Sequence, residues 1–136
     1  MYDALIIGGG PAGLQAALTL GRMHRRTLLV DSGEYRNARV HHAQNLLTND
    51  GRAPADIRSR ARAEIAAYAT VEIRDAAVTA LTQTDGGFRA KVAGDEVLTR
   101  HVILATGLHD ELPAILGLAE QWGDRAANCP FCHGHE

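Results

Sequence analysis

Two cysteines near the C-terminal end carry the most distinctive chemistry of the chain. Cys129 and Cys132 form a Cys-x-x-Cys pair around Pro130 and Phe131. Such close thiols can cycle between a dithiol and a disulfide, one thiolate attacking a substrate while the other resolves the product. His133 follows directly and could exchange a proton with either thiol near neutral pH, although an exposed histidine without a role also fits. The pattern predicts a catalytic group of Cys129, Cys132 and His133.

Other interpretations of the cysteine pair stay open from the residues alone. A Cys-x-x-Cys-His string also matches the attachment of c-type haem, a reaction that requires export. A zinc site would need Cys129, Cys132, His133 and His135 within one short stretch, whereas structural zinc usually draws ligand pairs from separated segments. Two unreactive thiols are the remaining alternative. We favour the redox pair and expect no metal site.

A glycine-rich loop near the N-terminus predicts a dinucleotide site. Gly8, Gly10 and Gly13 fit the G-x-G-x-x-G pattern. They lie between an expected strand, Asp3 to Ile7, and an expected helix, Ala12 to Met23. The first glycine permits a tight turn, the second lets the backbone approach a pyrophosphate, and the third lets helix and strand pack closely. The helix N-terminus adds free N–H groups and a positive dipole end for phosphates.

An acidic residue stands where a ribose-binding residue is expected. Asp31 ends a second buried strand that begins at Thr27, about 20 residues beyond the glycine loop. A carboxylate there accepts hydrogen bonds from ribose hydroxyls, and its charge repels a 2′-phosphate, which argues against NADP in this site. The order strand, helix, strand predicts a parallel pair with a right-handed crossover. A glycine turn in a domain without nucleotide is the plainer alternative.

The remaining elements predict an α/β domain. Residues 32–53 show no regular pattern, and a loop of that length inside a compact domain is usually functional. Residues 54–68 return to helical spacing, with Arg60 and Glu64 as an i, i+4 pair. Short strands are expected at residues 71–73, 77–82, 88–92, 96–98 and 101–105, with a hairpin turn at 85–87. The predicted fold is a Rossmann-like parallel sheet with an inserted antiparallel β-meander.

Composition excludes several classes of function. The 136 residues suffice for one domain with a core, and the net charge of -2 indicates no strong attraction to nucleic acid or anionic lipid. No stretch approaches the roughly 20 apolar residues of a membrane span. The first apolar run, Ala4 to Ile7, breaks into glycines without a cleavage site, so no signal peptide is expected. Two cysteines in such a chain indicate a cytoplasmic redox or metal motif and not a structural disulfide.

On these motifs the chain resembles the low-molecular-weight thioredoxin reductases and their relatives, the flavin-dependent dithiol oxidases of disulfide natural-product pathways. Four stretches carry the resemblance in the family's order, namely Ile6 to Gly13, Leu29 to Gly33, Val102 to Gly107 and Cys129 to Gly134. The resemblance implies an FAD-dependent thiol–disulfide oxidoreductase in which electrons pass between the flavin and the cysteine pair. It also implies a disulfide or dithiol substrate, either a thioredoxin-like protein or a small molecule.

The resemblance also implies a set of cofactor-binding residues. They are Gly8, Gly10, Pro11, Ala12, Gly13, Asp31, Ser32, Asn45, Val78, Ala105, Thr106 and Gly107. The glycine loop would hold the pyrophosphate of FAD and Asp31 its adenosine ribose. Asn45 would lie in the loop that approaches the flavin, and the backbone of Val78 would face adenine. Residues 105–107 would close over the cofactor.

Two departures from the family pattern affect the expected function. By resemblance Cys132 would face the flavin ring and Cys129 the substrate disulfide. Thioredoxin reductases usually carry Asp after the second cysteine, whereas this chain has His133, which looks more like the dithiol oxidases that return electrons to oxygen. The chain also covers less than half of the family pattern, without the second glycine-rich fingerprint, for NADPH. NADPH would therefore act through a domain absent from this chain.

The short length shapes the expected organisation. We expect residues 1–113 to form the N-terminal part of the FAD-binding domain. Residues 114–136 would be a linker and the truncated start of the redox/NADPH domain. The alternative to an enzyme is a non-catalytic nucleotide-binding half that needs a second chain, and a homodimer is also compatible with the pattern. The isolated chain is expected to bind FAD weakly or not at all.

Overall fold

A six-stranded mixed sheet organises the computed structural model, which describes residues 1–135. Its strands are β1 (Tyr2–Ile7), β2 (Thr27–Asp31), β3 (Val71–Asp75), β4 (Val78–Thr84), β5 (Gly87–Val92) and β6 (Asp95–Leu104). The spatial order is β3-β2-β1-β6-β5-β4. Neighbours from β3 to β6 pair in parallel, and β6, β5 and β4 pair antiparallel. The parallel sheet and the antiparallel meander agree with the fold predicted from the sequence.

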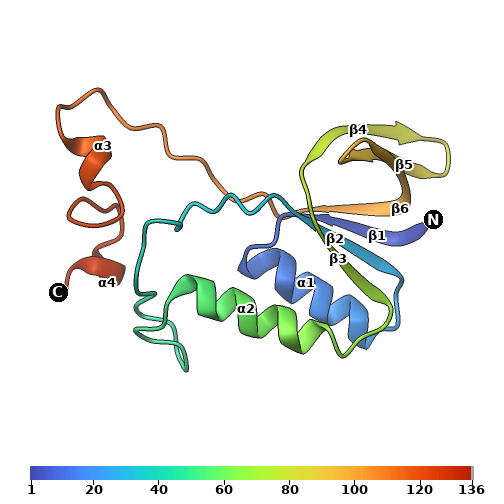
Figure 1. Ribbon diagram of the computed structural model, residues 1–136, viewed down its shortest axis with the longest axis horizontal. Helices are drawn as coiled ribbons and strands as arrows, with labels where there is room; N and C mark the ends of the chain where they lie inside the picture. The colour runs from blue at the N-terminus through green and yellow to red at the C-terminus, as the bar shows by residue number, and fades with distance from the viewer. Residues whose placement is uncertain (136) are drawn as a thin grey trace.

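Side chains that alternate along β1 and β2 build a core on each face of the sheet. On one face they pack with helices α1 (Pro11–Arg22) and α2 (Pro54–Ile65). On the other face they pack against the meander, so that in Figure 1 the helices lie below the parallel strands while β4 and β5 lie above them. The buried residues of the helical core are Ile6, Leu14, Ala17, Leu29 and Ile65. Those of the second core are Leu5, Leu28, Val30, Ala90, Val92 and Val97.

Strand β6 joins two stretches that the sequence pattern separates. Residues 96–98 and 101–105 were expected as two strands, but one strand runs from Asp95 to Leu104. Its first half pairs with β5 and its second half with β1, and Thr99 pairs with both. Thr99 is buried while Arg100 is exposed, so the polar residues between the apolar runs continue the alternation instead of breaking it. The strand therefore links the parallel sheet to the meander.

Helix α2 ends earlier than its spacing predicts, and its ion pairs differ. The helix stops at Ile65, and Tyr68 lies beyond it, against Gly21 of α1. Within residues 1–135, the predicted pair of Arg60 and Glu64 forms no ion pair, because both side chains point into water, which competes for them. The ion pairs of this helix come instead from Arg62.

The chain beyond β6 leaves the sheet and forms the other end of an elongated molecule (Figure 1). This segment, residues 105–135, is called the tail here. It contains two short helices, α3 (Leu118–Gln121) and α4 (Pro130–His133). Residues 32–53, called the crossing loop, run from β2 to α2 and reach the tail on the way (Figure 1). In residues 1–135 no helix is both long and apolar enough to span a membrane.

Candidate functional site

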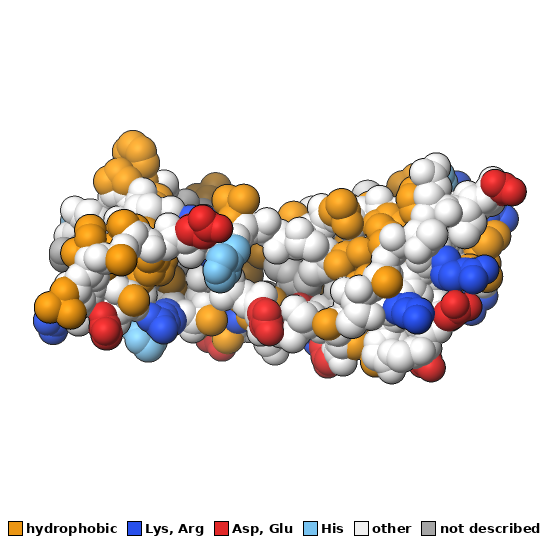
Figure 2. Space-filling view, turned by 90° about the horizontal axis from the view of Figure 1, so that it is seen from above, with side chains coloured by type: hydrophobic (Ala, Val, Ile, Leu, Met, Phe, Trp, Pro, Cys, Tyr) orange, Lys and Arg blue, Asp and Glu red, His pale blue; other side chains and the backbone are white. Residues whose placement is uncertain are grey.

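A cavity of about 720 Å³ lies at the carboxyl ends of the parallel strands, between the glycine loop, the crossing loop and the tail. In the space-filling view the surface dips between the two ends of the molecule (Figure 2). The predicted site residues that line the cavity are Gly8, Gly10, Pro11, Asp31, Ser32, Val78, Ala105, Thr106, Gly107, Cys129, Cys132 and His133. Ligands of open α/β sheets bind at this edge. The structure thus brings the glycine loop and the cysteine pair to one cavity.

Three predicted residues do not line this cavity. Gly13 is buried in the contact between α1 and the sheet, and Ala12 is exposed on the first turn of α1. Asn45 is exposed in the crossing loop, where its backbone N–H donates to Asp50 Oδ1 at 2.7 Å. Gly13 has the packing role that the glycine pattern predicts, whereas nothing in the described structure brings Asn45 to the cavity wall.

The glycines of the loop serve two different purposes. Gly8 has a φ of 111°, and a Cβ there would lie 2.3 Å from the carbonyl oxygen of Ala105. A Cβ on Gly13 would lie 1.9 Å from the carbonyl oxygen of Gly8. Gly10 has a φ of -75°, and a Cβ there would meet no atom within 4 Å. Packing therefore explains Gly8 and Gly13, but not Gly10.

The N-terminus of α1 offers a site for an anion. No side chain caps this helix end at Gly10, and the first turn contains no acidic residue. The first N–H groups of the helix thus lack a side-chain partner where they meet the cavity. The space in front of Gly10 and these free donors fit the pyrophosphate of a dinucleotide.

Asp31 lies at the end of β2 with its carboxylate already partly engaged. The residue is only 2% exposed. Its Oδ2 accepts hydrogen bonds from Tyr35 Oη and from Arg62 Nη2, the latter at 2.7 Å, while Oδ1 accepts one from the Gly33 N–H at 3.1 Å. Burial acts to raise the pKa of this carboxyl, but the hydrogen bonds from Tyr35, Gly33 and Arg62 together outweigh it. The pKa of Asp31 therefore lies below its ordinary value, and the carboxylate stays charged.

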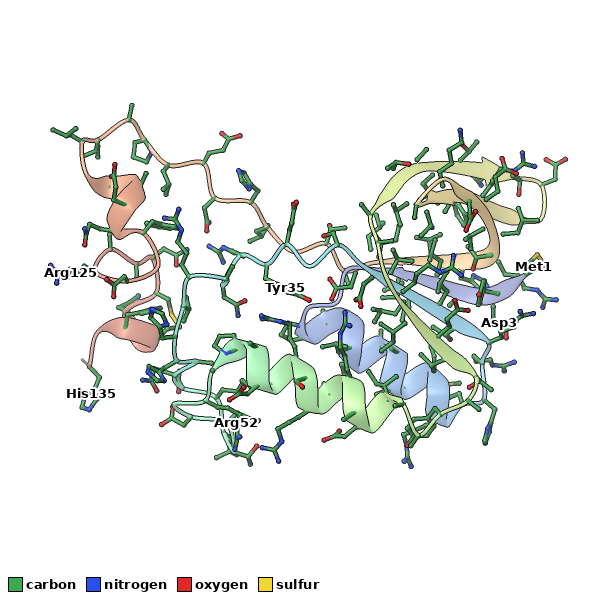
Figure 3. The ribbon with its side chains drawn as sticks, viewed as in Figure 1. Met1, Asp3, Tyr35, Arg52, Arg125 and His135 are labelled. Carbon is green, nitrogen blue, oxygen red and sulfur yellow. A yellow bond between two sulfur atoms is a disulfide. The ribbon has the colours of Figure 1, made fainter. Side chains whose placement is uncertain are left out.

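Arg58 and Arg62 of α2 contact residues at and around Asp31, and neither arginine was predicted from the sequence. Arg62 Nη2 lies 2.7 Å from Asp75 Oδ1 as well as from Asp31. The Arg58 guanidinium lies 3.7 Å from the centre of the Tyr35 ring, and Tyr35 sits between the sheet and the tail in Figure 3. The only available signal was the four-residue spacing of Arg58 and Arg62, which places them on one helical face.

A disulfide joins Cys129 and Cys132 at the opposite end of the cavity. It appears as the yellow bond beside α4 in Figure 3. The next residue, His133, has both ring nitrogens buried without a hydrogen-bond partner among residues 1–135. In the same described part of the chain, no three His, Cys, Asp or Glu side chains gather where they could hold a metal ion. Both cysteines and His133 line the cavity.

The tail is held to the crossing loop by charged hydrogen bonds that the sequence did not predict. Arg36 donates from Nε to Asp110 Oδ2 at 2.8 Å and from Nη2 to Asp110 Oδ1 at 2.7 Å. Arg39 Nη1 donates to the carbonyl oxygen of Ala119 at 2.7 Å. The hydrogen bond from Arg36 lowers the pKa of Asp110 below its ordinary value. These contacts join the crossing loop to the segment that leads to the disulfide.

Known proteins resemble this chain over nearly its whole length. The family model described as pyridine nucleotide-disulphide oxidoreductase matches residues 2–134. Thioredoxin reductase aclD of Aspergillus oryzae is 43% identical over 140 residues, which cover 100% of this chain and 44% of the relative. Thioredoxin reductase tcpT of Claviceps purpurea is 40% identical over 140 residues, with the same two coverages.

Solved structures give the same result. The crystal structure of an oxidoreductase from Agrobacterium tumefaciens superposes with a TM-score of 0.95 at 43% identity. The alignment covers 98% of this chain and 45% of that one. The chain therefore spans less than half the length of each of these three proteins.

Proposed function

The chain belongs to the pyridine nucleotide-disulphide oxidoreductase family, and we propose that it supplies the nucleotide-binding part and the redox disulfide of an FAD-dependent thiol–disulfide oxidoreductase. Family membership implies that a flavin is bound. The observation that carries the proposal is a single cavity lined by the uncapped N-terminus of α1 and by the Cys129–Cys132 disulfide. A bound flavin would supply a two-electron carrier that exchanges electrons with this disulfide.

The residues of the cavity divide the binding of FAD between them. The backbone at Gly10 and the first turn of α1 bind the pyrophosphate. Asp31 would accept a hydrogen bond from the adenosine ribose, with Ser32 beside it, and Val78 lines the cavity where adenine would lie. Residues 105–107 follow β6 directly, line the cavity and would border a bound cofactor. FAD, rather than a smaller flavin, is favoured because these groups fit an adenosine half.

The cysteine pair carries out thiol–disulfide exchange. In the reductive direction, the Cys129 thiolate attacks one sulfur of a substrate disulfide and releases the other sulfur as a thiolate, which His133 protonates. The Cys132 thiolate then attacks the Cys129 sulfur, so that the substrate leaves as a dithiol and the Cys129–Cys132 disulfide forms again. The oxidative direction is the reverse of these steps. The names of the relatives support a thioredoxin-like disulfide substrate.

Oxidation of dithiols with oxygen as the electron acceptor is the second candidate. It is favoured by His133, whose buried ring nitrogens have no partner among residues 1–135 and remain free to take the proton of an incoming thiol. A reductase would instead need NADPH bound by a region outside this chain. A non-catalytic nucleotide-binding half that needs a second chain is the third candidate.

The remaining proposals concern organisation. We assign residues 1–113 to the FAD-binding domain and the following residues to a linker and the start of a redox domain, of which residue 136 lies outside the described part. A homodimer or a complementing second chain is compatible with this proposal. A cytoplasmic location suits a cysteine pair that cycles, because cytosolic reductants keep thiols available.

A steady-state assay separates the candidates. The protein is produced from its complete reading frame, and its flavin content is measured first. NADPH consumption with oxidised thioredoxin identifies a reductase, and oxygen consumption with a dithiol identifies an oxidase. In both cases the Cys129→Ser and Cys132→Ser variants should lose turnover at least about 100-fold, because exchange needs both thiols. Turnover that survives in both variants would exclude the assigned chemistry.

A further inference from the structure

The hydrogen bonds to Asp31 leave few acceptor positions on its carboxylate for a ligand. A charged carboxylate offers about four acceptor positions, two on each oxygen. Both positions on Oδ2 are taken, by Tyr35 and by Arg62, and one on Oδ1 is taken by the Gly33 N–H. One acceptor position remains, on Oδ1, and Asp31 borders the cavity.

Arg62 also offsets the repulsion between two carboxylates at the end of the sheet. Asp31 and Asp75 are partners in the parallel pairing of β2 and β3, so two carboxylates end neighbouring strands. Like charges at such positions repel one another. A single Arg62 nitrogen lies 2.7 Å from an oxygen of each and offsets that repulsion. Without Arg62, Asp31 would be a buried carboxylate facing another carboxylate.

Tyr35 holds the same oxygen from the other side. Its hydroxyl donates to Asp31 Oδ2, and its ring is fixed by the Arg58 guanidinium stacked on it. Arg58 in turn donates from Nη1 to Asn37 Oδ1 at 3.2 Å, which ties it to the crossing loop. The orientation of the Asp31 carboxylate is therefore set jointly by α2 and by the crossing loop.

We infer that Arg62 and Tyr35 are positioning residues that hold the Asp31 carboxylate charged and oriented, so that it binds a single hydroxyl of the adenosine ribose through Oδ1. This inference rests on the proposed function, because it presupposes a dinucleotide in the cavity. It also makes Asp31 a one-hydroxyl acceptor and not a two-hydroxyl clamp. Arg62 and Tyr35 act through Asp31 and need not touch the cofactor themselves.

The test measures FAD affinity as a function of pH in the protein produced from its complete reading frame. Bound flavin is removed, and rebinding is followed by quenching of FAD fluorescence. The variants are Arg62→Met, Arg62→Lys, Tyr35→Phe and Asp31→Asn. Arg60→Met is the matched control, because Arg60 is an exposed arginine on the same helix without an ion pair in residues 1–135.

The expected results follow from the groups around Asp31. Arg62→Met should raise the dissociation constant about tenfold or more at pH 7, because hydrogen bonds to charged groups are the strong ones. The constant should rise further between pH 7 and pH 5, where the wild type stays constant. Burial raises the pKa of Tyr35 and the Asp75 hydrogen bond raises that of Arg62, so neither titrates in this range. Arg62→Lys should restore part of the affinity.

Two further variants keep the result interpretable. Tyr35→Phe removes one hydrogen bond and no charge, so it should weaken binding severalfold while the protein still folds. Asp31→Asn should bind weakly at every pH, because no carboxylate remains to titrate. Equal affinity of Arg62→Met and Arg60→Met from pH 5 to pH 8 would overturn the positioning role.

A measurement without flavin separates failure of this inference from failure of the proposed function. The carboxyl pKa of Asp31 is followed by carbon NMR in the wild type and in Arg62→Met. A raised pKa in the variant, together with a wild type that binds no FAD, would leave the positioning of Asp31 intact and refute the proposed cofactor. An unchanged pKa would refute the positioning role itself.

Discussion

Arg36 and Asp110 meet through two parallel hydrogen bonds of 2.8 and 2.7 Å, although they lie on different segments of the chain. Arg36 belongs to the crossing loop, and Asp110 lies in the tail that leads to the disulfide. Planar two-point contacts between arginine and a carboxylate fix orientation as well as distance. This pair therefore helps to set the disulfide against the cavity that begins at the glycine loop.

Replacing Asp110 by Asn should loosen the tail while leaving the sheet intact. Amide exchange in residues 111–125 should accelerate about two- to fivefold, since an exposed ion pair contributes modestly. Hydrogen exchange with mass spectrometry measures this. Glu96→Gln, which removes the exposed pair of Arg89 and Glu96 on the meander, is the control and should leave tail exchange unchanged. Unchanged exchange in Asp110→Asn would show that the pair does not hold the tail.

Replacing Gly13 by alanine should lower stability, whereas replacing Gly10 by alanine should lower flavin affinity. Gly13→Ala places a Cβ 1.9 Å from the Gly8 carbonyl oxygen, and we expect it to lower the free energy of unfolding by about 1–3 kcal/mol. Gly10→Ala meets no protein atom, so its stability should stay within about 0.5 kcal/mol of the wild type while flavin affinity falls. Urea unfolding and FAD titration on both variants decide this. A Gly10→Ala variant that keeps full affinity would place the pyrophosphate elsewhere.

His133→Asn should slow thiol–disulfide exchange by roughly 100-fold, the smaller end of the range for a lost proton donor or acceptor. The flavin content and the Cys129–Cys132 disulfide should remain. His135→Asn is the matched control, because His135 is exposed and does not line the cavity. Stopped-flow measurement of exchange with a small dithiol gives both rates. Equal exchange rates in the two variants would show that His133 takes no part in proton transfer.

Acid should destabilise the protein in part through Asp31. Its folded pKa lies below the unfolded value of about 3.9, so its contribution is present above that pH and is lost as pH falls through the folded pKa. One such carboxyl contributes at most about 1.4 kcal/mol per pH unit to the slope of stability against pH. Urea unfolding between pH 2.5 and pH 6 should therefore show a shallower slope in Asp31→Asn, by no more than that amount. Equal slopes of stability against pH in the wild type and in Asp31→Asn would show that the pKa of Asp31 is not lowered in the folded protein.

The isolated 136-residue chain should bind FAD weakly or not at all. It spans 44% of relatives such as aclD, and large apolar side chains next to the cavity, including Leu104 and Leu108, remain 69% and 72% exposed. Orange side chains also gather on the tail end of the molecule in Figure 2. Fluorescence titration of the purified chain measures the affinity. Tight binding of one FAD per chain would show that these residues suffice.

The sequence predicts the parts of the site that depend on local backbone geometry. The strand, glycine loop, helix and second strand occur in order because each follows from periodicity and from glycine placement. The Cys129–Cys132 pair can also be identified from the sequence, because two cysteines separated by two residues can bring their sulfur atoms close to one another. In the structure, Gly8, Asp31 and Cys132 all line one cavity.

Contacts between distant side chains could not be predicted in the same way. Arg62 meets Asp31 and Asp75 only because β2 and β3 end side by side, and the sequence does not show that an arginine of this helix reaches both carboxylates. The Arg36–Asp110 pair likewise depends on where the crossing loop meets the tail. The prediction of two separate strands on either side of Thr99 was wrong for a related reason. The alternate burial along β6 depends on pairing with two different strands, which the local sequence does not show.

The central claim is that a bound flavin exchanges electrons with the Cys129–Cys132 pair. The most direct measurement is the anaerobic absorbance of the protein from its complete reading frame, near 450 nm as free flavins absorb, during addition of a dithiol. We predict a flavin band that bleaches in the wild type and persists in both Cys129→Ser and Cys132→Ser, which should still bind flavin. A colourless protein, or equal bleaching in all three proteins, would contradict the claim.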